Sequence, residues 1–169
     1  MFRHGNMDST SYVISNFYNL LNHAALNTEK CEGFRFLEVG AGDSIGSGVV
    51  ASAFGMKPFI IDVDAFATKD IEFYKNIIRE LDNPLSDISA NDFISYEQMI
   101  KKLDITYLTD GTSSFEKIDD NSINIIISQA CLEHVRKKEF KLFMDENYRV
   151  CKKGALSIHS IDFKDHLDY

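Results

Sequence analysis

Two closely spaced glycines, Gly40 and Gly42, stand where one apolar segment ends and another begins. Residues 34–39 are mostly apolar, as in a buried strand, and the apolar periodicity that continues to Phe54 is typical of a helix. A strand, a tight turn and a helix open a βαβ unit, whose first turn faces a ligand. Gly40 allows the sharp turn, and Gly42 lets the backbone approach a bound molecule. The pair also occurs in ordinary turns, so its neighbours must indicate the ligand.

Carboxylates surround the two glycines. A dinucleotide-binding turn presents bare backbone N–H groups to a pyrophosphate at a helix N-terminus. Here Glu38 precedes the glycines and Asp43 follows them, so a phosphate would meet negative charge. Ile45 occupies the last position of the G-x-G-x-x-G pattern, where a dinucleotide site has Gly or Ala. The turn therefore favours a cationic ligand over NAD.

The stretch from Phe36 to Gly46 resembles motif I of the class I S-adenosylmethionine-dependent methyltransferases, with Glu38, Gly40 and Gly42 in register. It departs from that motif at Ser44, where many members have a third glycine. Within the superfamily it looks most like a group found in bacterial surface-glycan biosynthesis. The resemblance implies S-adenosyl-L-methionine as cofactor and S-adenosyl-L-homocysteine as product. The cofactor-binding residues that it implies are Glu38, Gly40, Ala41, Gly42, Asp43, Asp64, Ala65, Asp110, Gly111 and Gln129.

Acidic residues follow the second and third predicted strands. Asp64 lies where the methyltransferases carry the carboxylate that binds the ribose hydroxyls, although Asp is also a common helix cap. Asp62 is more ambiguous, because it can point to the other side of the strand. Asp110 resembles the position that accepts the adenine amino hydrogen, and an Asp-Gly pair is also an ordinary turn.

Histidines and aspartates follow the fourth and fifth predicted strands. The segment from Gln129 to His134 resembles the LEH region of type 11 methyltransferases, and histidine can exchange a proton near neutral pH. A second run, from His159 to His166, resembles one in the glycan-associated group and includes Asp162. We expect His134, Asp162 or His166 to act as the base. The alternatives are a structural Glu–His pair and a solvated chain end. We expect no metal site.

Composition limits the class of partner. The chain has 169 residues, a net charge of −8, 44% hydrophobic and 26% charged residues, which is typical of one globular domain. Nucleic acid is disfavoured, because its binding depends on the neutralisation of phosphates. Three distant cysteines suggest reduced thiols rather than disulfides or zinc. We find no signal sequence or bilayer-spanning run, and expect a cytoplasmic protein without membrane insertion.

Alternating elements predict an α/β, Rossmann-like fold with helices on both faces of a mostly parallel sheet. After an N-terminal helix over about residues 9–26, strands are expected at 34–39, 59–63, 104–108, 122–128 and 155–161, and the resemblance implies the order 3-2-1-4-5. Helices are expected to residue 54, from 71, from 91, over 129–135 and over 138–151. The resemblance implies a single domain, 1–169, truncated after the fifth strand. That strand would form an exposed edge open to homodimerisation.

Three functions remain open. The first is a methyltransferase that O-methylates a sugar, a glycan or another small molecule. The second is a non-catalytic domain that binds the same cofactor or serves as a scaffold. Ser44 gives it some weight, as does Asn124, at a position where the family often has an aspartate. The third is an NAD-binding oxidoreductase.

Overall fold

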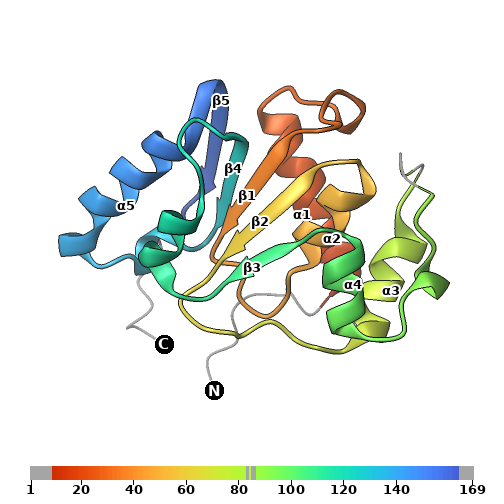
Figure 1. Cartoon of the computed structure of the whole chain (residues 1–169). Helices are drawn as coiled ribbons and strands as arrows, with labels where there is room; N and C mark the ends of the chain where they lie inside the picture. Colours follow the sequence, from red (N-terminus) through yellow and green to blue (C-terminus); the bar gives the residue numbers. More distant parts are fainter. Residues whose placement is uncertain (1–8, 83, 85–86, 164–169) are drawn as a thin grey trace.

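Five parallel strands form one sheet in the order β3-β2-β1-β4-β5 (Figure 1). The computed structural model describes residues 9–82, 84 and 87–163. Its strands are β1 (Arg35–Val39), β2 (Lys57–Ile61), β3 (Thr106–Leu108), β4 (Ile123–Gln129) and β5 (Cys151–Ser160). The predicted fold class and strand order are therefore confirmed.

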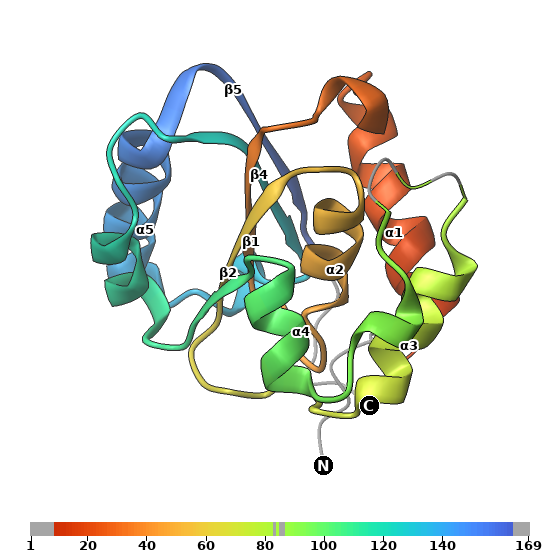
Figure 2. The same cartoon turned by 45° about the vertical axis from the view of Figure 1, so that its right-hand side comes forward.

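Helices cover both faces of this sheet, as Figures 1 and 2 show. One face carries α1 (Thr10–His23), α2 (Gly46–Ala53), α3 (Ile71–Glu80) and α4 (Tyr96–Lys102), which share a large apolar core. The other carries α5 (Lys137–Val150) and a 3-10 segment, η3 (Gly111–Lys117), over a smaller core. Phe36 of β1 faces the first core and Leu37 the second, because successive side chains of a strand alternate. None of the described helices is long and apolar enough to cross a bilayer.

The N-terminal helix α1 is shorter than predicted. Ser9 caps it by accepting from the Tyr12 N–H, and Val13 and Phe17 lie one turn apart on its buried face. It ends at His23, three residues before the predicted end, because Ala25 adopts a φ of 52° that cannot continue a right-handed helix.

The single helix predicted from residue 91 is wrong. The structure has a 3-10 turn, η2 (Ala90–Asp92), an extended Phe93, and then α4, which begins after Ser95. Ser95 accepts from the backbone N–H of Gln98 and so caps the second helix. Phe93 is buried from an extended backbone, so its apolar character did not indicate a helix.

The fifth strand begins earlier than predicted. The helix α5 passes directly into β5 at Cys151, and the segment 152–154, predicted to separate them, lies inside the strand. Gly154, with a φ of 83°, lies in a bulge between the pairs Ile123–Cys151 and Ile125–Leu156. Only Leu132–His134 (η4) of the predicted helical region 129–135 is helical, as a short 3-10 turn.

Candidate functional site

The carboxyl ends of the parallel strands lie along one edge of the sheet, where the turn after β1 meets the segments after β2 and β4 (Figure 1). Gly40, at this turn, has a φ of 80°, and its N–H donates to the Ile61 carbonyl at 2.8 Å. A Cβ on Gly40 would collide with the Cys131 side chain, whose Cβ would be only 2.7 Å away. Backbone conformation and lack of space therefore both require glycine here.

Asp62 connects the end of β2 to this turn. Its carboxylate accepts from the N–H of Gly42 at 2.8 Å and from the N–H of Val63 at 2.7 Å, and the residue is buried. The sequence did not determine to which side of the strand the Asp62 side chain points. In the structure it points to the glycine turn. Its hydrogen bonds hold a carboxylate beside the turn.

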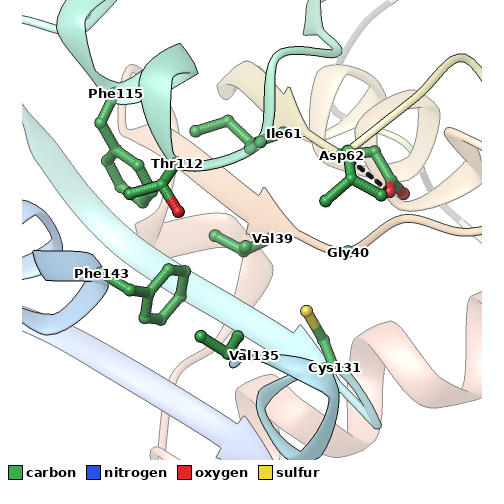
Figure 3. Close-up of a pocket in the computed structure, with 11 residues that line it drawn as sticks. Val39, Gly40, Ile61, Asp62, Thr112, Phe115, Cys131, Val135 and Phe143 are labelled. Atoms are coloured by element: carbon green, nitrogen blue, oxygen red, sulfur yellow. Dashed lines mark hydrogen bonds between the residues drawn. The ribbon is translucent and has the colours of Figure 1, made fainter. Parts of the chain in front are cut away.

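A pocket of about 70 Å³ opens beside Asp62 (Figure 3). Gly40 and Asp62 line one side, and apolar side chains from β1, β2, η3, α5 and the segment before α5 line the rest. These include Val39, Ile61, Phe115, Val135 and Phe143. The pocket thus combines one carboxylate with an apolar wall, an arrangement that suits a flat apolar group carrying hydrogen-bond donors at its edge.

Glu38 places a second carboxyl group beneath the turn. Burial raises its pKa to about 7, opposed by a hydrogen bond from Ser47 and reinforced by the charge of Asp62. The Asp62 carboxylate and the Glu38 carboxyl group, which is about half ionised at pH 7, together attract a cation and repel a phosphate. The charge argument made from the sequence is consistent with this geometry.

Cys131 is a pocket residue that the sequence analysis missed. Burial, with smaller contributions from Asp62, Glu133 and Glu38, raises the pKa of its thiol to about 12, so it stays protonated near neutral pH. The spacing of Cys131 from the other cysteines did not indicate a role in the site. The residue reaches the site only because the segment after β4 packs against Gly40.

The predicted cofactor residues of the turn lie together. Gly40 lines the pocket, the N–H of Gly42 binds Asp62, and Ala41 is buried between them. The carbonyl of Asp43 accepts from the N–H of Thr68, which joins the turn to the loop before α3. Which of these groups contacts a ligand stays a prediction.

Asp64 and Ala65 are exposed and do not line the pocket. Asp64 Oδ1 accepts from the Ala65 N–H at 2.7 Å, and its carbonyl accepts from the Tyr107 hydroxyl at 3.2 Å. The predicted contact of Asp64 with a ribose remains a prediction, and Asp62 is the carboxylate that the pocket contains.

The residues after β3 and β4 are divided between the pocket and the surface. Gly111 lines the pocket, and its N–H donates to the Asp62 carbonyl at 2.9 Å. Asp110 instead forms an exposed ion pair with Lys117, at 2.7 Å. Gln129 is the last residue of β4, is half-buried and does not line the pocket.

Two of the three residues predicted as bases lie in η4 and in the segment after β5. His134 is exposed at the end of η4. Its neighbour Glu133 accepts from the Asp162 N–H at 3.1 Å, which places Asp162 beside η4. His166 lies outside the described residues. No cluster suited to a metal ion occurs within 9–82, 84 and 87–163.

His159 lies within β5, inside the strand predicted over 155–161. Its Nδ1 is 2.8 Å from the Ser128 hydroxyl and its Nε2 is 2.7 Å from the Ser157 hydroxyl. Burial lowers its pKa, so both ring nitrogens serve these two hydrogen bonds in a neutral imidazole near pH 7.

Solved structures with the same fold are methyltransferases. Phosphoethanolamine N-methyltransferase 2 of Haemonchus contortus, in complex with S-adenosyl-L-methionine, has a TM-score of 0.54 and 19% identity over 87% of this chain and 28% of its own. Geranyl diphosphate C-methyltransferase from Streptomyces coelicolor, with S-adenosyl-L-homocysteine, has a TM-score of 0.52 and 14% identity over 86% of this chain and 42% of its own.

A Methanococcus maripaludis protein assigned as an S-adenosyl-L-methionine-dependent methyltransferase has a TM-score of 0.54 and 16% identity over 94% of this chain and 62% of its own. The chain thus spans less than two thirds of the length of these three proteins. No family model and no curated protein matches the sequence. The fold of this chain is that of the S-adenosyl-L-methionine-dependent methyltransferases.

Proposed function

We propose that this chain binds S-adenosyl-L-methionine at the turn formed by Gly40 and Gly42 and transfers its methyl group to a small acceptor. The observation that carries the proposal is the buried Asp62 carboxylate, fixed between this turn and an apolar pocket in a methyltransferase fold. Two of the similar proteins were solved with the cofactor or its product bound.

The residues fit the parts of that cofactor. Asp62 can accept from the ribose hydroxyls, and the apolar pocket beside it can take part of the adenine. The glycine turn and the neighbouring Glu38 suit the cationic methionine portion. Because a pocket for a drug-sized ligand measures roughly 300–1,000 Å³, the 70 Å³ pocket can hold only a part of the cofactor. The remainder would lie along the turn.

The reaction then depends on alignment and on a proton acceptor. When bound, the cofactor supplies a sulfonium methyl group, and S-adenosyl-L-homocysteine leaves with the electron pair of the broken C–S bond. The chain must hold the acceptor oxygen in line with that methyl and exclude water. Asp162 or His134, beside the segment after β5, would receive the hydroxyl proton.

The acceptor that we propose is a hydroxyl of a sugar, a glycan or another small molecule. The support is the sequence resemblance of residues 159–166 to the glycan-associated methyltransferases. The similar structures act on phosphoethanolamine and on geranyl diphosphate, so the fold itself does not select an acceptor.

Calorimetric titration with S-adenosyl-L-methionine, S-adenosyl-L-homocysteine and NADH tests the first step. Binding of the two sulfur compounds without NADH is expected, and the reverse would support the oxidoreductase. Release of S-adenosyl-L-homocysteine with pooled nucleotide sugars tests the second step. Binding without release from any acceptor pool would support the non-catalytic alternative.

A further inference from the structure

Residues 62–70 form the loop that joins β2 to α3, and this loop passes below the carboxyl ends of the strands (yellow in Figure 1). Asp62 and Val63, the first two residues of the loop, both line the pocket. The Val63 side chain is 72% exposed, so little packing holds it at the pocket. The shape of this part of the pocket therefore depends on how the backbone of the loop is held.

Two hydrogen bonds join the loop to the glycine turn. The N–H of Gly42 donates to the Asp62 carboxylate at 2.8 Å, and the N–H of Thr68 donates to the Asp43 carbonyl at 2.8 Å. We call residues 63–67, which lie between these two points, the arch. Residues 63–66 of the arch are exposed, so the arch keeps one conformation only if a neighbouring element supports it.

Tyr107 of β3 supplies that support. Its hydroxyl donates to the Asp64 carbonyl at 3.2 Å and accepts, over a longer 3.5 Å, from the N–H of Ala67. Burial raises the pKa of this phenol, so the hydroxyl stays protonated and remains a donor near neutral pH. One side chain therefore closes the span from Asp64 to Ala67.

Two more tyrosines belong to the same cluster. Tyr74 of α3 is fully buried, and its hydroxyl donates to the Thr68 carbonyl at 2.7 Å and accepts from the Ile45 N–H at 3.4 Å. Tyr96 of α4 lies against Tyr74, with 5.6 Å between the ring centroids. Within the described part of the chain, the Tyr96 hydroxyl makes no hydrogen bond to the loop, in contrast to those of Tyr74 and Tyr107.

We propose that Tyr107 is a positioning residue of the cofactor site, whose hydroxyl holds the arch so that Asp62 and Val63 keep the shape of the pocket. This inference rests on the proposed function, in which Asp62 accepts from the ribose and the pocket takes part of the adenine. Tyr107 does not line the pocket itself. It acts through the carbonyl of Asp64, the residue directly after Val63.

The ring and the hydroxyl of Tyr107 have separate roles. The ring packs against the larger core, whereas the hydroxyl binds the arch. Tyr107→Phe keeps the ring and removes the hydrogen bonds, so it separates support of the arch from support of the core. Tyr96→Phe makes the same chemical change in the same cluster and removes no described contact to the loop, which makes it the matched control.

Calorimetric titration with S-adenosyl-L-homocysteine tests the effect on the site. Tyr107→Phe should weaken binding roughly three- to tenfold, as expected for the loss of ordinary hydrogen bonds, and Tyr96→Phe should change it by less than about twofold. Unchanged affinity in Tyr107→Phe, or equal losses in the two variants, would overturn the proposal. Absence of binding to the native chain would instead contradict the proposed function.

Hydrogen–deuterium exchange without ligand determines whether the effect is local. In Tyr107→Phe the amides of residues 63–68 should exchange faster than in the native chain, whereas those of the buried helix α2 should not change. A general loss of stability would raise exchange in both segments. Equal exchange of residues 63–68 in the variant and the native chain, or a matching rise in α2, would refute the proposed role of Tyr107.

Discussion

Asp62 and Asp64 are two residues apart, yet they have different surroundings. Asp62 is buried beside the pocket, and Asp64 is exposed with a local hydrogen bond to Ala65. The sequence favoured Asp64, because local spacing resembles a known motif and does not report the direction of a side chain. What directs Asp62 is the N–H of Gly42, contributed from another strand end.

The two carboxylates can be compared directly. Asp62→Asn should weaken S-adenosyl-L-homocysteine binding by roughly 1.5–3 kcal/mol for each hydrogen bond to a charged group that is lost, and Asp64→Asn should leave it within a factor of two. Calorimetry of both variants measures this. The opposite ranking would restore Asp64 as the ribose ligand.

Gly40 and Cys131 form a second local test. Gly40→Ala should cost about 1–3 kcal/mol for overpacking against Cys131, and a further 1–2 kcal/mol or so for a side chain at positive φ. Adding Cys131→Gly should recover the first part and retain the second. Urea unfolding of the two single variants and the double variant measures the coupling. Strictly additive effects would show that the two residues do not touch.

The buried carboxyl of Glu38 makes stability depend on pH. Its pKa is about 7 in the folded chain against an ordinary 4.5, so the folded state holds this proton more tightly. Stability from this group is therefore lost as pH rises from about 4.5 to 7 and is level above that window. Relative to the Glu38→Gln variant, the native chain should lose up to roughly 3 kcal/mol of unfolding free energy between pH 4.5 and pH 7. Urea unfolding at pH 5, 6, 7 and 8 measures the difference, and parallel curves would contradict it.

At the scale of elements, apolar runs identified the strands and glycines identified the first turn. Five strands could be predicted from apolar runs such as the four isoleucines in β4 and the aliphatic run of β2, and the resemblance to the methyltransferases implied their order. Boundaries were less predictable. Phe93 has helical spacing to Tyr96 but an extended backbone, and Cys151 changes directly from helix to strand. Both depend on tertiary packing.

The cap of α4 supplies a measurement at this scale. Ser95 accepts from the Gln98 N–H at 3.2 Å, so Ser95→Ala should cost about 1 kcal/mol of unfolding free energy. Lys101→Ala, on the exposed surface of the same helix, is the control and should have little effect. Equal losses of unfolding free energy in the two variants would show that Ser95 does not cap α4, and would support a helix that begins at residue 91.

At the scale of the whole molecule, one sheet separates a large core under four helices from a smaller core under α5 and η3. The candidate site draws on the strand ends and on the smaller core. The pocket residues that could be predicted from the sequence were those of the glycine turn and Gly111. Phe115, Val135 and Phe143 reach it from segments that lie far apart in the sequence, and only packing brings them together.

The parallel arrangement of all five strands gives each chain a front, where the carboxyl ends gather, and a back. The groups that could contact a ligand at the strand ends therefore approach it from one end of the sheet. A protein fixed to a sensor chip through the opposite end would still present the turn after β1 to the flowing solution.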